Sequence, residues 1–354
     1  LTLKRECESG FQVLPQVGGF ELQLQRLSAE LDKYLEQPVP EEIREQVMEF
    51  YFSVWNFLGI CDRLDDNYVI YTEFSEEGHF WLHLYCVRPA ENLRQCLDCG
   101  MAAIFFSATL LPVNYYKDLL TGNMEDYAVY AKSPFDPANR LLLVGTDVSS
   151  RYSRRGAAEY ERMARYIHET VTVKTGNYLV FAPSYQVMEQ VADRCLAYED
   201  MECIRQESGM TEEEREAFLK EFEKERNHSL VGFCVMGGIF SEGIDLTEDR
   251  LIGALIIGTG LPQVCREREI VKEYFDKKGM DGFAYAYQYP GMNKVLQAAG
   301  RVIRTESDRG MILLMDDRFA TISYQRLFPR EWEQHAYCQV DSLAGQLQEF
   351  WLKY

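Results

Sequence analysis

The chain has 354 residues, a formal net charge of −19 and a hydrophobic content of 47%. Its length exceeds the usual size of one domain, so we expect two folded units, and its hydrophobic content excludes a disordered chain. The acidic balance argues against a general basic coat for nucleic acid, although it leaves room for a local basic groove.

Ten cysteines are scattered through the sequence, several of them in apolar segments, as at Cys195 and Cys234. This distribution predicts buried, reduced thiols of a cytoplasmic protein and not a disulfide framework. No apolar run approaches the roughly 20 residues that span a bilayer, so we expect no membrane partner. The chain begins at Leu1 without an initiator methionine, and we expect it to be part of a longer protein.

Residues 1–60 are predicted to be helical. Leucines between Leu22 and Leu35 recur at helical spacing, and a second amphipathic run begins after Pro40 with acidic residues in its first turn. Residues 68–87 then change to a pattern that predicts two strands joined by a turn.

After residue 110, predicted strands and helices alternate regularly. Such alternation implies parallel βαβ units, a sheet covered on both faces, and ligands bound at the carboxyl ends of the strands. The predicted strands are 140–148, 177–184, 201–205, 229–236, 251–258 and 310–317, and the predicted helices are 157–171, 185–198, 212–225, 265–278 and 297–304.

The stretch QAAGRVIR, residues 297–304, places two arginines close together. On a helix, Gln297, Arg301 and Arg304 would share one face, because residues three and four apart are neighbours. Two guanidiniums on one face suit phosphate oxygens, and Gly300 leaves room for close approach of another backbone. The alternative is a solvated basic face at a helix end.

The stretch GGIFSEGIDL follows a predicted buried strand. Gly237, Gly238 and Gly243 permit backbone conformations in which amides face an anion, and Glu242 and Asp245 supply acceptors. An ordinary glycine-containing turn after a strand remains the alternative.

Four segments of the sequence, taken in chain order, resemble motifs III, IV, V and VI of the carboxyl-terminal half of a superfamily 2 DNA helicase of the XPD/DinG type. Each segment alone is weakly specific, and their order makes the resemblance specific. The four segments are SATL at 107–110, LVFAPSYQ at 179–186, GGIFSEGIDL at 237–246 and QAAGRVIR at 297–304.

The resemblance implies an α/β fold in which residues 111–354 form the second RecA-like motor domain, a parallel sheet with helices on both faces. Residues 61–110 would be the end of the first motor domain, including motif III, and residues 1–60 the end of a helical, arch-like insertion. The implied function is that of an ATP-dependent DNA helicase, in which this half supplies the arginine finger and part of the track for single-stranded DNA.

The resemblance also implies roles for individual residues. Gln297, Arg301 and Arg304 would reach the nucleotide phosphates, with one arginine stabilising charge on the γ-phosphoryl group. The other implied roles are nucleotide binding for Glu242, Gly243, Asp245 and Gly300, DNA contact for Ser184 and Tyr185, and coupling of hydrolysis to domain closure for Ser107, Ala108 and Thr109.

The sequence departs from the family by lacking a G-x-x-x-x-G-K-[ST] motif and a D-E-A-H-like box. ATP and Mg²⁺ would therefore be bound mainly by a missing half, the amino-terminal motor domain of the same protein. The family's iron–sulfur cluster would also belong to that half and not to this chain. We expect this chain alone not to hydrolyse ATP at a useful rate.

Two other sequence features have structural explanations that we favour. Cys96 and Cys99, with His79, His83 and Cys86 nearby, suggest a metal site, but their spacing fits zinc poorly and packing is the simpler interpretation. The aromatic run FAYAYQYP at 283–290 could stack bases but more often packs in a core.

A second functional hypothesis comes from another class. The chain could be a RecA-like module without a catalytic task that binds a partner protein through its acidic surface. The presence of both arginines in QAAGRVIR argues against it, since such a module need not keep the pair.

Overall fold

The computed structural model describes residues 2–8, 10–38, 40–240, 246 and 250–352. It separates into two compact units. The amino-terminal unit comprises Leu1–Phe105 and Tyr116–Asp126, and the carboxyl-terminal unit comprises Phe106–Tyr115 and Tyr127–Tyr354. Within the described residues, no helix has both the length and the apolar character of a membrane span.

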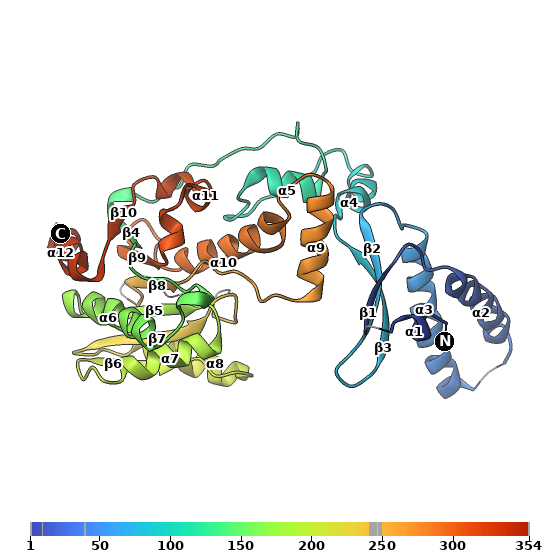
Figure 1. Ribbon diagram of the computed structural model, residues 1–354, viewed down its shortest axis with the longest axis horizontal. Helices are drawn as coiled ribbons and strands as arrows, with labels where there is room; N and C mark the ends of the chain where they lie inside the picture. The colour runs from blue at the N-terminus through green and yellow to red at the C-terminus, as the bar shows by residue number, and fades with distance from the viewer. Residues whose placement is uncertain (1, 9, 39, 241–245, 247–249, 353–354) are drawn as a thin grey trace. The chain divides into compact units, whose positions relative to one another are not determined.

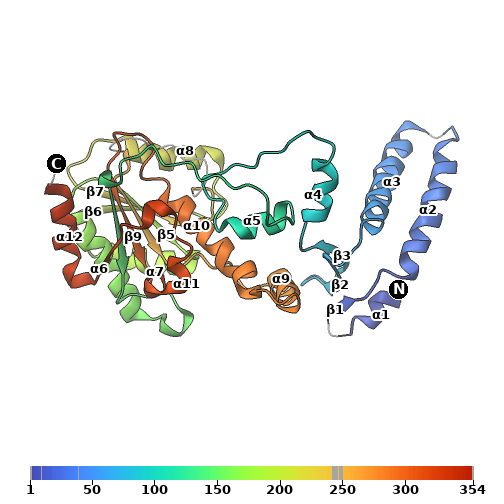
Figure 2. The same cartoon turned by 90° about the horizontal axis from the view of Figure 1, so that it is seen from above.

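The amino-terminal unit combines a helical hairpin with a small antiparallel sheet of order β1-β2-β3. Helix α2 packs along α3 (Figure 2), and a small core around Val17, Cys61 and Ile70 joins α3 to the sheet. The elements are α1 (Thr2–Glu6), β1 (Phe11–Leu14), α2 (Gly19–Leu35), α3 (Glu41–Cys61), β2 (Tyr68–Phe74), β3 (Phe80–Cys86) and α4 (Ala90–Leu97). Helix α5 (Val113–Leu120) contains residues of both units.

The predicted hairpin at residues 68–87 is confirmed, with β2 and β3 paired from Tyr68↔Cys86 to Phe74↔Phe80. The prediction that the first 60 residues are helical is wrong for β1. Gly10 and Gly18 flank this short strand with positive φ angles of 76° and 67°, which a right-handed helix does not contain, so no helix runs through either position.

The carboxyl-terminal unit is an α/β domain built on a seven-stranded parallel sheet of order β10-β4-β9-β8-β5-β7-β6, counted over the described residues. This confirms the predicted fold class. The strands are β4 (Arg140–Gly145), β5 (Asn177–Ala182), β6 (Met201–Arg205), β7 (Ser229–Val235), β8 (Gly253–Ile257), β9 (Gly310–Met315) and β10 (Ala336–Cys338).

Helices cover both faces of this sheet (Figure 1). Successive strand residues point to opposite faces, so Val180 packs into one core and Leu179 and Phe181 into the other. One core includes α6 (Ala157–Val173), α7 (Tyr185–Cys195) and α12 (Val340–Leu352), and the other includes α8 (Glu212–Lys220), α10 (Tyr289–Ala299) and α11 (Ile322–Gln325).

Because every neighbouring pair in this sheet is parallel, the strands end at a common carboxyl edge and begin at a common amino edge. The connections after β4, β5, β7, β8 and β9 start at the carboxyl edge. The connection from α10 into β9 reaches the sheet at the amino edge. The candidate site residues are therefore distributed over two edges of one sheet.

Candidate functional site

The two arginines of QAAGRVIR lie in the connection between α10 and β9. Helix α10 ends at Ala299, so the prediction of a helix through Arg304 is wrong, and Gln297 alone of the three polar side chains is on the helix. Gly300 is the C-cap residue, and glycine has a low helix propensity. Arg301 and Arg304 follow it in irregular structure.

The connection is held by the buried carboxylate of Asp308. One oxygen of Asp308 accepts the backbone N–H groups of Arg304 and Thr305 at 2.7 and 2.8 Å, and the other accepts the Thr305 hydroxyl at 2.6 Å. Val302 is also buried, and its side chain lies so close to Gly310 that a Cβ there would be 2.3 Å from Val302 Cγ1. These contacts fix the backbone on which both arginines are carried.

The side chains of Gln297, Arg301 and Arg304 are all half-buried, whereas Gly300 is exposed. The arginines are therefore neither a fully solvated surface pair nor part of the deep core. A half-buried guanidinium keeps its charge and interacts more strongly with an anion than one in open water does.

The segment after β7 begins with a turn at a glycine of positive φ. Gly237 has a φ of 75°, and Lys294 of α10 lies over it, with Lys294 Cε 2.9 Å from where a Cβ would stand. Burial, together with the charge of Arg268, lowers the pKa of the Lys294 amine. Three predicted nucleotide-binding residues, Glu242, Gly243 and Asp245, lie outside the described residues.

Ser184 and Tyr185 lie at the carboxyl edge, where β5 leads into α7. Ser184 is the N-cap of α7, and its hydroxyl oxygen accepts the Val187 N–H at 3.3 Å. The Tyr185 hydroxyl accepts a hydrogen bond from Gln206 Nε2 at 3.0 Å, and its half-buried ring packs against the core. Ser184 can still donate its hydroxyl proton to a phosphate, while the ring of Tyr185 is partly used in packing.

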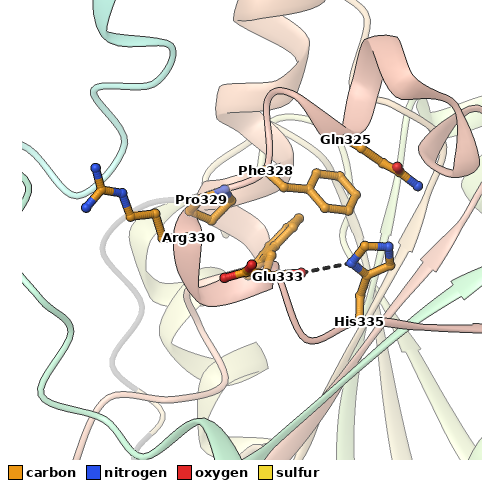
Figure 3. Close-up of a pocket in the computed structure, with 7 residues that line it drawn as sticks. Gln325, Phe328, Pro329, Arg330, Glu333 and His335 are labelled. Atoms are coloured by element: carbon orange, nitrogen blue, oxygen red, sulfur yellow. Dashed lines mark hydrogen bonds between the residues drawn. The ribbon is translucent and has the colours of Figure 1, made fainter.

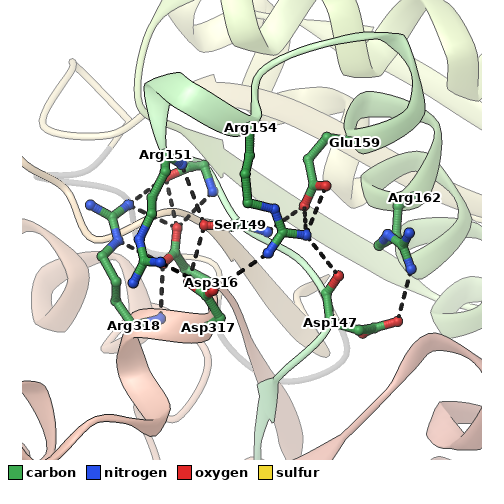
Figure 4. Close-up of polar contacts among 10 residues, drawn as sticks. Asp147, Ser149, Arg151, Arg154, Glu159, Arg162, Asp316, Asp317 and Arg318 are labelled. Carbon is green, nitrogen blue, oxygen red and sulfur yellow. Dashed lines mark hydrogen bonds and ion pairs between the residues drawn. The ribbon is translucent and has the colours of Figure 1, made fainter.

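Hydrogen bonds from Ser150 tie the loop after β4 to a buried ion pair at the end of β9 (Figure 4). Asp316 is fully buried and accepts hydrogen bonds from Ser150 N and Oγ, each at 2.8 Å, and from Arg318 Nε at 2.7 Å. Burial alone would raise the pKa of Asp316, but the hydrogen bond and charge of Arg318, with the Ser150 hydrogen bonds, hold it below its ordinary value.

The same loop is braced at a second place. Arg154 bridges Glu159 at 3.0 Å and Asp317 at 3.4 Å (Figure 4). These ion pairs hold the loop in a defined shape. The side chain of Tyr152 on this loop is 86% exposed, and the Arg155 guanidinium lies 5.5 Å from the centroid of its ring. The sequence analysis missed this aromatic–cation pair, although the RYSRR stretch contained its signal.

The SATL segment lies in irregular structure. Ser107 and Ala108 are exposed and Thr109 is half-buried, and the Ser107 hydroxyl oxygen accepts the Thr109 N–H at 3.2 Å. The preceding apolar residues 102–106 form no strand, and the side chains of Ile104 and Phe106 are 85% and 88% exposed.

The aromatic run at 283–290 packs in a core, as we favoured. It contains a π-helix (Ala284–Gln288) in which Tyr285 and Tyr287 are buried, and Tyr115 packs against Tyr285 with ring centroids 5.2 Å apart.

The residues that suggested a metal site make other contacts. His83 stacks on Tyr71 and lies 3.1 Å from Glu73, and Cys86 accepts a hydrogen bond from Asn92. Across the part of the chain that the structure describes, no group of three or more His, Cys, Asp and Glu residues could hold a metal ion.

A separate pocket of about 500 Å³ lies between residues 325 and 335 (Figure 3). Phe328, Trp332 and His335 give it an aromatic lining, and the His335 Nδ1–H donates to the Trp332 carbonyl at 2.9 Å. Arg330 and Glu333 stand at its rim. None of the predicted site residues lines it.

Comparison with known proteins gives a consistent set of similarities. Residues 167–335 match the family model described as the helicase C-terminal domain. A "probable ATP-dependent helicase" of Methanocaldococcus jannaschii is 26% identical over 295 residues, which cover 77% of this chain and 42% of that protein. The ATP-dependent DNA helicase XPD of Sulfolobus acidocaldarius is 26% identical over 187 residues, covering 52% and 32% respectively.

A solved structure of XPD in its apo form has the same fold. It aligns with a TM-score of 0.59 at 17% identity and covers 96% of this chain and 67% of that one. The chain spans less than half the length of these two curated relatives.

Proposed function

We propose that this chain is the carboxyl-terminal motor half of an ATP-dependent DNA helicase of the XPD/DinG type that translocates on single-stranded DNA. The match of residues 167–335 to the helicase C-terminal domain family and the similarity to XPD support this proposal. The carboxyl-terminal unit would be its second RecA-like motor domain. ATP and Mg²⁺ would be held mainly by the other motor domain of the same protein.

The observation that carries this proposal is the connection that bears Arg301 and Arg304. Asp308 and Val302 hold its backbone from within the unit, which would place both arginines before a nucleotide binds. Cationic groups positioned in advance stabilise the charge of a phosphoryl transition state without reorganising. Gln297, on the last turn of α10, would orient the same phosphates, and exposed Gly300 would let the nucleotide approach.

Residues of the segment that follows β7 would complete the nucleotide site. We assign Glu242, Gly243 and Asp245 to it because the resemblance of GGIFSEGIDL to motif V implies that role, and Lys294 of α10 lies over Gly237 at the start of the same segment. Burial and the charge of Arg268 lower the pKa of this lysine. A nearby anion would favour the charged form of its amine.

The exposed apolar segment at residues 102–106 supports a missing first motor domain. Ile104 and Phe106 have the size and apolar character of buried strand residues, yet they are almost fully exposed. We assign residues 61–110 to the end of that domain and residues 1–60 to an arch-like insertion. Ser107, Ala108 and Thr109 would then connect the two motor domains and couple hydrolysis to closure.

Single-stranded DNA would follow the carboxyl edge of the sheet. Ser184 lies after β5, and Tyr152 and Arg155 lie after β4. The two strands are three positions apart in the sheet, so their carboxyl ends are about 14 Å from each other. A hydroxyl donor suits a phosphate, and an exposed aromatic ring beside a guanidinium suits base stacking. Tyr185 would contribute through its hydroxyl more than through its packed ring.

A helicase assay on the longer protein tests the proposal. With the amino-terminal motor domain restored, ATP-dependent separation of a partial duplex is expected, and this chain alone should give none. Failure of the longer protein to hydrolyse ATP in the presence of single-stranded DNA would remove the motor assignment.

The competing hypothesis is an interaction module without a catalytic task. The aromatic pocket between residues 325 and 335 and the net charge of −19 are the features that favour it. DNA binding that responds to ATP in the longer protein would exclude this alternative, whereas DNA binding that ignores ATP would support it.

A further inference from the structure

Two cysteines, Cys96 and Cys99, lie three residues apart where α4 ends, and both are exposed. The backbone continues as a helical turn beyond the last residue of α4: the Cys99 N–H donates to the Cys96 carbonyl at 3.3 Å, and the Gly100 N–H donates to the Leu97 carbonyl at 3.0 Å. Residues three apart on such a turn share one face, with Cβ atoms about 5–6 Å apart.

The sulfur of Cys99 is turned toward the part of the helix that carries Cys96. Its S–H donates to the Gln95 carbonyl at 3.4 Å, and Gln95 is the residue next to Cys96. A disulfide needs Cα atoms 4.4–6.8 Å apart and Cβ atoms about 3.8 Å apart. The two residues must therefore close by about 1–2 Å, which is a local change at a helix end, where the last turn is the least constrained part of the element.

The other cysteines differ from this pair in burial. Cys7, Cys61, Cys195, Cys234 and Cys338 are buried, and Cys86 and Cys203 are half-buried. Burial raises the pKa of Cys61 and of Cys203 to about 11 and that of Cys338 to about 12, which keeps these thiols protonated and unreactive.

Cys265 is exposed as well, but it does not form a comparable pair. The cysteines that precede and follow it in sequence, Cys234 and Cys338, are both buried. Cys96 and Cys99 are thus the pair in which exposure and proximity coincide.

We propose that Cys96 and Cys99 form a reversible intramolecular disulfide by exchange with a small disulfide such as oxidised glutathione. The thiolate of one cysteine attacks a glutathione sulfur, the glutathione S–S bond breaks, and one glutathione thiolate leaves. The second cysteine thiolate then attacks the protein sulfur of the mixed disulfide and releases the second glutathione. The chain loses two electrons and two protons, and oxidised glutathione gains them. This inference does not use the proposed nucleotide or DNA sites, and it requires that both thiols stay exposed beside the rest of the proposed first motor domain.

The test is equilibration of the native 354-residue chain with oxidised glutathione at pH 8, followed by acid quenching, alkylation under denaturing conditions and digestion with trypsin. Cleavage after Arg94 and Lys117 leaves both cysteines on one peptide, residues 95–117. We expect that peptide to escape alkylation and to be lighter by about 2 Da than its reduced form. Dithiothreitol should restore two alkylatable thiols.

Three variants provide the controls. Cys96→Ser and Cys99→Ser should each stop at a mixed disulfide and retain one glutathione on the peptide, whereas Cys265→Ser should leave the result unchanged. Stable attachment of glutathione to both cysteines of the native chain, full alkylation of both, or a disulfide that joins either of them to another cysteine would overturn the proposal.

Discussion

Asp308 is the residue that fixes Arg304 in place. Its carboxylate is buried and accepts three hydrogen bonds from the connection that follows α10. The backbone at Arg304 is held by this carboxylate, whereas the Arg301 N–H still donates to the Ala298 carbonyl of α10 at 3.3 Å. A positioning residue of this kind affects turnover without touching the nucleotide.

Asp308→Ala should lower the free energy of unfolding by about 2 kcal/mol, because two backbone N–H groups and a hydroxyl lose their acceptor. It should also lower the ATP turnover of the longer protein while leaving its affinity for single-stranded DNA intact. Asp136→Ala is a matched control, since Asp136 also accepts a backbone N–H, that of Ala138 at 2.9 Å, in an exposed turn. Equal turnover in the two variants would show that Asp308 does not position the arginines.

A second prediction at the level of single residues concerns Tyr152, whose aromatic ring is exposed on the braced loop after β4. Tyr152→Ala should weaken binding of oligo(dT) to the longer protein by about 1–3 kcal/mol, the range for loss of one base-stacking contact. Tyr152→Phe keeps the ring and should bind as the parent does. Fluorescence anisotropy at fixed salt measures both, and a Phe variant as weak as the Ala variant would exclude stacking.

At the scale of elements, Asp316 and Arg318 form an ion pair just after β9, and both side chains form hydrogen bonds with Ser150 of the loop after β4. Breaking a buried pair by neutralising one partner leaves an uncompensated charge, so Asp316→Asn should cost about 3–5 kcal/mol of stability. Replacing both partners with apolar residues should recover part of that loss. Chemical denaturation of the single and double variants measures the coupling.

This ion pair also gives a pH dependence with a definite sign. The pKa of Asp316 in the folded chain lies below its ordinary value of 3.8. Its contribution to stability is therefore fully present above pH 3.8 and is lost as the pH falls through the lower, folded value. Asp316→Asn should remove that part of the acid limb of the stability curve, and an unchanged acid limb would contradict the assignment.

The sequence was informative where patterns are long and local. The regular alternation of strands and helices after residue 110 predicted a parallel sheet covered on both faces, and β6 (Met201–Arg205) was predicted with its observed bounds. The three-residue strand β10 carries too little pattern to be found, and β1 was hidden by its helical neighbours.

Contacts between distant residues were beyond the reach of the sequence. Ser150 and Asp316 are 166 residues apart, and no local pattern brings them together. The end of α10 was also mispredicted, because the helical spacing of Gln297, Arg301 and Arg304 concealed the effects of Gly300 and Asp308. The identities of these site residues came from their motif, while their geometry came from tertiary contacts.

At the scale of the whole molecule, we propose that the chain is one half of a motor. The chain covers 42% of the Methanocaldococcus jannaschii relative and carries no P-loop motif, so we expect no ATP hydrolysis from the 354 residues alone. A malachite-green assay with and without single-stranded DNA measures this directly. Phosphate release stimulated by DNA from the isolated chain would contradict the assignment of the nucleotide site to two domains.

The central claim is that Arg301 and Arg304 complete a nucleotide site of which this chain forms one wall. Its most direct test is the steady-state ATP turnover of the longer protein with saturating single-stranded DNA. The Arg301→Ala and Arg304→Ala variants are compared with Arg326→Ala, a control that removes an exposed arginine of the same unit. We predict a loss of about 10³-fold or more for whichever arginine acts as the finger and a clear loss for the other, with DNA affinity retained and Arg326→Ala unaffected. Turnover equal to that of the parent protein in both Arg301→Ala and Arg304→Ala would contradict the claim.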